Sequence, residues 1–291
     1  MIKELVILSG KGGTGKTSIA ASFAALAENK IMADCDVDAA DLHLVLTPEN
    51  YKEEVFGGGN KAYINSRNCV SCGKCINLCR FDAISDFFTV DTLSCEGCGV
   101  CAVFCPADAI EMKPHQSGKW FESETEYGPL VHARLGIAEG NSGKLVTIIR
   151  NKAKEIAKNE NINLIIADGS PGTGCPVIAT VTGSSFVLIV TEPTVSGIHD
   201  LKRVHTLIEH FRVRSAVCIN RYDINLEKAD EIEEFCRVKE IPLFGRIPYD
   251  DDVTKAQVAG KSIVEYSSGP AAEAVKVMWN KIKKEILTEG V

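Results

Sequence analysis

The stretch Gly10-Lys11-Gly12-Gly13-Thr14-Gly15-Lys16-Thr17 decides the fold of this chain, because it fits the phosphate-loop pattern G-x-x-x-x-G-K-T. An apolar segment precedes it at 2–8, and an Ala-rich segment that favours a helix follows it at 17–27. Its glycines allow backbone N–H groups to converge on phosphate oxygens. Lys16 is expected to reach the β- and γ-phosphates, and the Thr17 hydroxyl is expected to bind Mg²⁺. The stretch therefore predicts a site for a magnesium nucleotide.

The rest of the chain alternates between short apolar runs and amphipathic stretches. The apolar runs lie at 30–34, 162–167, 185–190, 215–219 and 243–247, and the helix-like stretches lie at 144–158, 198–211 and 226–237. Such alternation predicts an α/β fold, a mostly parallel P-loop sheet with helices on both faces. A last amphipathic stretch at 274–287 is expected to dock on this core rather than on a membrane surface.

Composition excludes several classes of partner. The 291 residues are 45% apolar and carry a formal net charge of -7, without a run of basic residues. No nucleic acid partner is expected from this charge. The N-terminal segment has no export-signal pattern and no window approaches the roughly 20 apolar residues of a membrane span, so we expect a cytoplasmic protein with no membrane partner.

Twelve cysteines in such a chain favour metal binding over disulfides, because cytosolic thiols are kept reduced. Eight of them form two copies of C-x-x-C-x-x-C-x-x-x-C, at 69–79 and 95–105, each followed by the triplet Asp-Ala-Ile. The pattern is typical of bacterial ferredoxins with two 4Fe-4S clusters. We therefore expect an inserted small α+β ferredoxin-like domain at 57–114, within a discontinuous P-loop ATPase domain at 1–56 and 115–291.

In this ferredoxin pattern the fourth cysteine of each run serves the other cluster. The predicted ligands are Cys69, Cys72, Cys75 and Cys105 for the first cluster, and Cys95, Cys98, Cys101 and Cys79 for the second. Arg80 stands where such proteins usually have proline, whereas Pro106 follows the second run. The alternative is zinc, but zinc sites usually pair two C-x-x-C knuckles across a longer gap.

Two acidic segments complete the predicted nucleotide site. The strand at 164–167 ends in Asp168, which places a carboxylate beside Mg²⁺ at the carboxyl edge of the sheet. Asp34-Cys35-Asp36 closes the strand at 30–34, and a carboxylate there suits the orientation of an attacking water.

With its second lysine, Lys11, the loop resembles the deviant Walker A motif of the MinD, Mrp and nitrogenase iron protein superfamily. The resemblance implies that Lys11 crosses to a partner's ATP in a sandwich homodimer, or in a dimer with a paralogous ATPase. It also implies that Asp36 lies near the attacking water and that Asn220 contacts adenine. The catalytic residues are then expected to be Lys11, Lys16 and Asp36. The segment 220–223 also imitates the guanine signature N-K-x-D, with Arg221 in the lysine position, but the loop favours ATP.

Cys175 follows Asp168 by seven residues, the spacing at which the nitrogenase iron protein places a ligand of its bridging cluster. A second bridging ligand is not evident, so a plain thiol near the dimer interface is the simpler interpretation.

These features lead to one functional hypothesis and two alternatives. The first is an ATP-gated electron-transfer protein that acts on a redox or metalloprotein partner. The alternatives are an ATPase for assembly of iron-sulfur clusters or another metallocofactor, and a MinD-like positioning ATPase with a structural insert.

Overall fold

The computed structural model describes residues 2–136 and 142–287, which form two compact units. The first unit comprises Met1–Glu53, Trp120–Arg134 and Ser142–Val291, and the second comprises Glu54–Lys119 and Leu135–Asn141. The predicted insertion, 57–114, lies wholly inside the second unit.

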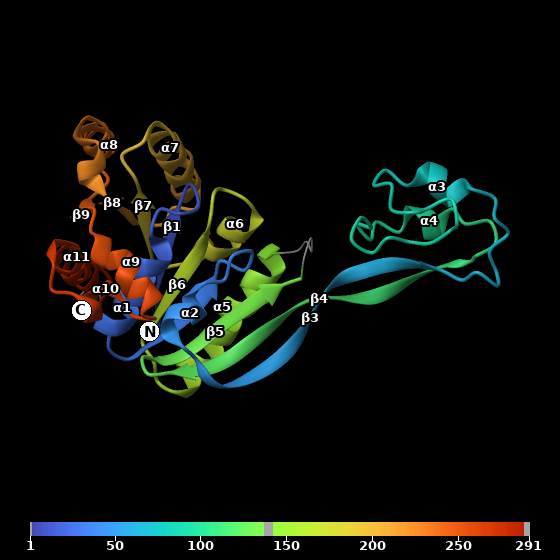
Figure 1. Ribbon diagram of the computed structural model, residues 1–291, viewed down its shortest axis with the longest axis horizontal. Coiled ribbons are helices and arrows are strands. Elements are labelled where there is room, and N and C mark those ends of the chain that lie inside the picture. Colours follow the sequence, from blue (N-terminus) through green and yellow to red (C-terminus); the bar gives the residue numbers. More distant parts are fainter. Residues whose placement is uncertain (1, 137–141, 288–291) are drawn as a thin grey trace. The chain divides into compact units, whose positions relative to one another are not determined.

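The described residues form a nine-stranded sheet in the order β3-β4-β5-β2-β6-β1-β7-β8-β9 (Figure 1). The strands are β1 (Lys3–Ser9), β2 (Lys30–Cys35), β3 (Glu49–Ile64), β4 (Ile110–Thr125), β5 (Gly128–Leu135), β6 (Leu164–Pro171), β7 (Phe186–Thr191), β8 (Ser215–Asn220) and β9 (Leu243–Ile247). Every neighbouring pair from β5 to β9 is parallel. The expected α/β fold with a mostly parallel sheet is thus confirmed.

Helices cover both faces of this sheet. They are α1 (Lys16–Leu26), α2 (Leu42–Leu46), α5 (Ser142–Asn159), α6 (Cys175–Val181), α7 (Val195–His210), α8 (Leu226–Val238), α9 (Asp251–Val258), α10 (Ile263–Tyr266) and α11 (Pro270–Leu287), with a 3-10 turn at Tyr222–Ile224. Leu5 and Ile7 of β1 pack into one core cluster with residues of α1 and α11. Val6 and Leu8 point to the opposite face, since side chains alternate along a strand, and they are equally buried.

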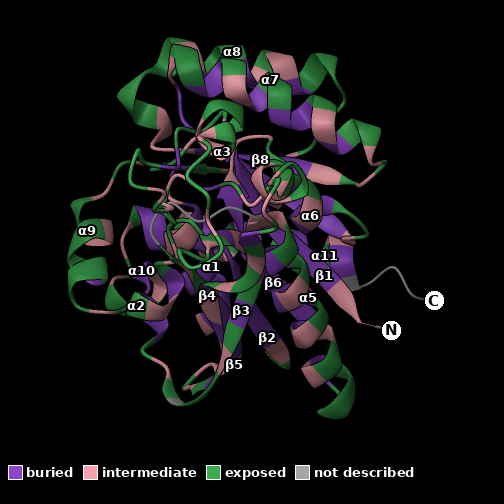
Figure 2. Cartoon of the chain, turned by 90° about the vertical axis from the view of Figure 1, so that its right-hand side faces the viewer, coloured by how far each residue is buried: buried purple, intermediate pink, exposed green. Residues whose placement is uncertain are grey.

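Burial on both faces explains why the central strands are continuous apolar runs (Figure 2, strands β1, β2 and β6). The amphipathic stretch near the C-terminus forms α11 and docks on the core as expected. Its buried residues include Val275, Met278, Trp279, Ile282 and Ile286. The Trp279 ring lies 4.9 Å from that of Phe23 in α1. In the part of the chain that the structure describes, no helix has the length and apolar character to cross a bilayer.

The second unit contains the short helices α3 (Lys74–Leu78) and α4 (Val100–Val103) and parts of β3 and β4. Its small core consists of Ala62, Ala83, Cys95 and Ile110, against which Cys75, Cys79, Cys101 and Cys105 pack. The 26-residue repeat is visible in the backbone. Left-handed residues recur as Ser71 and Gly97, as Gly73 and Gly99, and as Asp82 and Asp108. The two cysteine runs therefore fold into equivalent loops.

Candidate functional site

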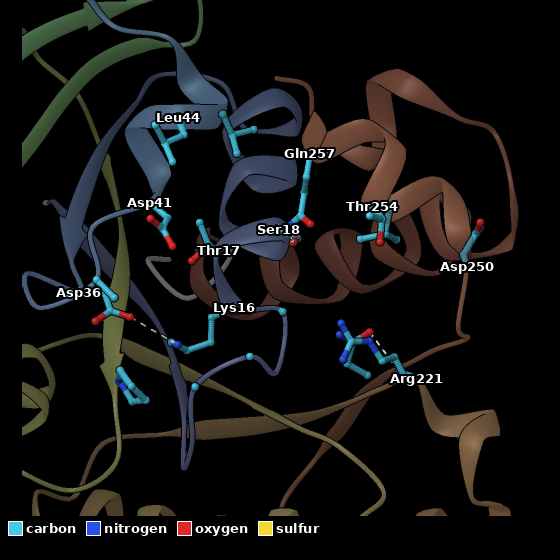
Figure 3. Close-up of a pocket in the computed structure, with 18 of the residues that line it drawn as sticks. Lys16, Thr17, Ser18, Asp36, Asp41, Leu44, Arg221, Asp250, Thr254 and Gln257 are labelled. Atoms are coloured by element: carbon cyan, nitrogen blue, oxygen red, sulfur yellow. Dashed lines mark hydrogen bonds and ion pairs between the residues drawn. The ribbon is translucent and has the colours of Figure 1, made fainter. Parts of the chain in front are cut away.

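A cavity of about 550 Å³ lies at the carboxyl ends of the central strands. Its walls come from the predicted phosphate loop, the segment after β2, the end of β8 and helix α9 (Figure 3). Lining residues predicted from the sequence are Gly12, Gly13, Gly15, Lys16, Thr17, Asp36 and Asn220. Lining residues that the sequence did not single out include Thr254 and Gln257 of α9. No local pattern marks these residues, since α9 reaches the cavity only through the tertiary fold.

Gly15 shows why the loop requires glycine. Its φ of +91° lies in the left-handed region, and a Cβ atom there would lie 2.4 Å from Nδ2 of Asn220. That amide donates a hydrogen bond of 2.8 Å to the carbonyl of Thr14. Asn220, which the resemblance assigned to adenine, therefore also braces the loop from the end of β8.

Lys16 is almost fully buried at the start of α1, and its Nζ lies 3.7 Å from Oδ2 of Asp36 (Figure 3). Burial raises the pKa of Asp36 to about 6, although the charge of Lys16 lowers it. The other carboxylate oxygen of Asp36 is buried without a hydrogen-bond partner. A lysine and an acid with a free acceptor thus face the cavity, as expected for phosphate binding and orientation of a water.

Thr17 and Asp168 lie together at the Mg²⁺ position predicted from the sequence. The Thr17 hydroxyl donates a 2.7 Å hydrogen bond to Oδ2 of Asp168, whose Oδ1 is buried and unpartnered. Burial raises the pKa of Asp168 to about 6, while Lys16 and the Thr17 hydroxyl lower it. A hydroxyl and a carboxylate with one unpaired oxygen are hard oxygen ligands that suit Mg²⁺, so these residues fit the ion.

Asp34 has a role that the sequence did not reveal. Its carboxylate accepts the backbone N–H groups of Asp36 (3.2 Å) and Leu42 (3.2 Å). Burial, together with the charges of Asp168 and Asp36, raises its pKa well above the usual range. Asp34 therefore fixes the segment that carries Asp36, and it faces no nucleotide itself.

Ionisation of Asp168 should be visible in thermal stability. Because its pKa is raised in the folded state, the folded protein binds more protons than the unfolded chain between about pH 4 and 6, and stability falls as the pH rises through 6. Asp168→Asn lacks this loss, worth on the order of 2–3 kcal/mol. Without magnesium or nucleotide, the variant should melt about 5 °C above the natural protein at pH 7.5, and this difference should shrink to roughly half at pH 5 and nearly vanish toward pH 4.

Differential scanning fluorimetry across this pH range measures the difference in melting temperature. The contribution of the histidines to the pH dependence cancels in this difference, because both proteins carry them. Magnesium-ADP should stabilise the natural protein and leave Asp168→Asn nearly unchanged. A melting difference that is constant from pH 5 to 7.5 would contradict the assignment.

Lys11 lies at the start of the loop with its side chain directed to the segment after β7. Its Nζ lies 3.3 Å from Oε2 of Glu192 and within hydrogen-bonding distance of the Thr194 and Ser196 hydroxyls, at 3.4 and 3.3 Å. In this single chain the lysine therefore contacts its own subunit.

Six of the eight cysteines of the second unit lie in two groups of three. Burial raises the pKa of Cys75, and its neighbours Cys69 and Cys72 act in the same direction. Burial likewise raises the pKa of Cys101, with smaller contributions from Cys95 and Cys98. In each group the backbone N–H of the residue after the third cysteine points at that cysteine's sulfur and lowers the pKa of its thiol.

Cys79 lies beside the cysteines of the other run. It lines one small pocket together with Cys95, Cys98 and Cys101, and the apolar side chains of Ile84 and Met112 complete the wall. These four cysteines are the predicted ligand set of the second cluster. Among the described residues, no group of three or more Cys, His, Asp or Glu side chains is placed to hold a single metal ion. A 4Fe-4S cluster does not require cysteines that converge on a single metal position, because each cysteine binds a different iron atom of the cluster.

Cys175 begins α6 and is exposed, with its Cβ packed near Gly143 at the start of α5. Cys218 and Cys236 are buried in the first unit, as small apolar side chains would be. The plain thiol near a dimer interface that we expect at Cys175 stays a prediction.

Comparison with known proteins identifies the family. Residues 5–263 match the model of the CobQ/CobB/MinD/ParA nucleotide binding domain. The uncharacterized protein MJ0578 of Methanocaldococcus jannaschii is 35% identical over 98% of both chains. MJ0579 of the same organism is 29% identical over 90% of this chain and 92% of its own.

Solved structures share the fold. MinD from Pyrococcus horikoshii, in complex with Mg-ADP, superposes with a TM-score of 0.61 at 17% identity, over 98% of this chain and 97% of that chain. Apo McdA from Cyanothece gives a TM-score of 0.54 at 15% identity, over 96% and 100%. The chain belongs to the CobQ/CobB/MinD/ParA family of nucleotide-binding proteins.

Proposed function

We propose that this protein is an ATP-driven switch in which nucleotide state gates electron transfer through two 4Fe-4S clusters held by the second unit. The observation that carries the proposal is the pocket shared by Cys79, Cys95, Cys98 and Cys101, in a chain that also forms a phosphate-loop cavity. Such clusters supply one-electron transfer at low potential when bound. The cytoplasm, where thiols are reduced, suits these cysteines.

The nucleotide half of the proposal follows from the geometry of the first unit. ATP binds with its phosphates on the N-terminus of α1, where backbone N–H groups and the buried Lys16 meet their charge. Thr17 and Asp168 hold Mg²⁺, and Asp36 orients the attacking water at the γ-phosphate. Lys11 leaves its own subunit and completes the site of a second subunit, either another copy or a paralogous ATPase.

The cluster half of the proposal is supported by the local fold. Three cysteines of each run lie together, the fourth of the first run lies with the second group, and the left-handed backbone positions repeat in both halves. The first cluster would take Cys69, Cys72, Cys75 and Cys105. Backbone N–H groups directed at sulfur, such as that of Ala109 at 3.3 Å from Sγ of Cys105, are the contacts that tune such centres.

A positioning ATPase is the second candidate, and the comparisons favour it. The solved structures that resemble the chain include MinD and McdA, and one of them is a MinC:MinD cell division complex from Aquifex aeolicus. These likenesses support an ATPase function and give no support to an electron-transfer role. In this case the clusters would be structural, and their oxidation state would not respond to ATP. The third candidate, an ATPase for metallocofactor assembly, predicts clusters that pass to an apo-protein.

The dimer switch is tested with Lys11→Ala. The variant should lose ATP-dependent dimerisation in light scattering, and its ATP turnover should fall by about a hundredfold, because a cation supplied in trans stabilises the transferred phosphoryl group. Magnesium-ADP binding by the monomer, measured by calorimetry, separates this loss from a failure to bind nucleotide. Full turnover by a monomeric Lys11→Ala protein would refute the role in trans.

A further inference from the structure

Glu192 follows β7 and is the one carboxylate that contacts both Lys11 and Arg221 in the described chain. Its Oε2 lies 3.3 Å from Nζ of Lys11, and its Oε1 accepts a 2.6 Å hydrogen bond from Nη1 of Arg221. The side chain is only 12% exposed, whereas Lys11 is 31% and Arg221 39% exposed. Two partly exposed cations therefore share one nearly buried anion, each on its own oxygen.

Hydrogen bonds hold the backbone around Glu192 in the turn that leads into α7. The Glu192 carbonyl accepts the N–H of Thr194 at 2.8 Å, and the Thr194 hydroxyl accepts the N–H of Gly197 at 3.0 Å, which caps α7. A Cβ atom at Gly197 would lie 2.3 Å from the Glu192 carbonyl. The glycine thus allows a close approach that fixes the turn carrying Glu192.

The two cations belong to different parts of the nucleotide site. Lys11 is in the phosphate loop, whereas Arg221 follows β8 and lines the cavity beside Asn220. Arg221 has a left-handed backbone (φ 53°), and its N–H donates to Oδ1 of Asn220 at 3.1 Å. The Asn220 amide in turn donates to Thr14 in the loop. Glu192 therefore connects the β8 end of the cavity to the lysine of the loop.

We propose that Glu192 is a positioning residue that holds Lys11 on its own subunit until a second, ATP-loaded subunit draws the lysine away. Arg221 makes this release possible, because it keeps the buried carboxylate paired after Lys11 has left. This inference rests on the proposed role of Lys11 in trans and adds a resting state to it. Glu192 thereby sets the ATP concentration at which subunits associate.

Glu192→Gln tests the hold on Lys11 directly in the full-length, nucleotide-free protein. The side chain keeps its shape but loses its charge, so Lys11 should react about two- to fivefold faster with an amine-acylating reagent, followed by mass spectrometry of its peptide. Lys239, which is remote from the cavity, is the internal reference. Glu192→Asp keeps the charge and should return the rate toward that of the natural protein, which a merely structural role would not require.

The same variants are then titrated with ATP in light scattering. The ATP concentration that gives half-maximal dimer should fall about two- to fivefold in Glu192→Gln and should rise in Arg221→Gln, where Lys11 is the only cation left on Glu192. An unchanged acylation rate of Lys11 in Glu192→Gln would show that Glu192 does not hold Lys11. An unchanged ATP concentration for half-maximal dimer would show that this contact does not control the association of subunits. If the natural protein does not dimerise with ATP, the proposed function fails, while the acylation rate still decides whether Glu192 holds Lys11.

Discussion

Lys16→Ala is expected to lower ATP turnover by about a thousandfold, the largest effect in the nucleotide site. Lys16 is 5% exposed and is the cation nearest to Asp36. Without it, the carboxylates of Asp36 and Asp168 face the triphosphate uncompensated, so both ATP binding and transition-state stabilisation suffer. The measurement is steady-state phosphate release, with ATP binding followed by calorimetry.

Lys239→Ala is the matched control, because it removes a lysine at the end of α8, remote from the cavity, and its turnover should equal that of the natural protein. Turnover of Lys16→Ala within tenfold of the natural protein would show that this cavity is not the hydrolytic site.

Cys79→Ala is expected to halve the iron content of the anaerobically reconstituted protein, from about eight to about four iron atoms per chain. The structure places Cys79 in the pocket of the second cysteine run, so the cluster that it loses should be that of Cys95, Cys98 and Cys101. Iron and acid-sulfide analysis measures the loss. Cys175→Ala is the control and should retain about eight iron atoms.

Double variants show which cluster Cys79 serves. Cys79→Ala combined with Cys98→Ala removes two ligands of one predicted cluster, so about four iron atoms should remain. Cys79→Ala combined with Cys72→Ala removes one ligand from each cluster, and nearly all iron should be lost. The reverse order of the two results would mean that Cys79 serves its own run.

Patterns within a short stretch predicted the local geometry of the phosphate loop. The phosphate loop fixes its own geometry through glycine positions such as Gly15, and it lies between a strand and a helix as expected. Asp168 lies beside Thr17 because parallel strands bring their carboxyl ends to one edge of the sheet. Strand and helix periodicity predicted the sheet for a similar reason, since burial on both faces requires continuous apolar runs.

Contacts between distant segments that carry no recognisable motif could not be predicted from the sequence. Nothing near Glu192 in the sequence indicates that it would contact Lys11, which is separated from it by most of the chain. The sequence shows Asp34 only as part of an acidic pair, but its carboxylate accepts backbone N–H groups of the segment that follows. The cavity wall from α9 was missed because its residues have ordinary helix composition and reach the site only through packing.

The proposed function joins an ATPase that closes on nucleotide to a cysteine module that carries electrons. The ferredoxin-like assignment of the second unit and the coupling between the halves are the steps that go beyond family membership. Both are tested together by following the cysteine module while the nucleotide changes, since a ligand shifts an equilibrium only if it binds the two states differently.

The most direct measurement is anaerobic EPR of the reconstituted, dithionite-reduced protein with no nucleotide, with magnesium-ADP and with magnesium-ATP. The proposed function predicts signals of reduced 4Fe-4S clusters whose spectrum or midpoint potential changes with ATP and not with ADP. Lys11→Ala should abolish this response to ATP. A protein that binds zinc instead of iron would contradict the cluster assignment. Clusters that ignore ATP would contradict the gating and favour a positioning or assembly ATPase.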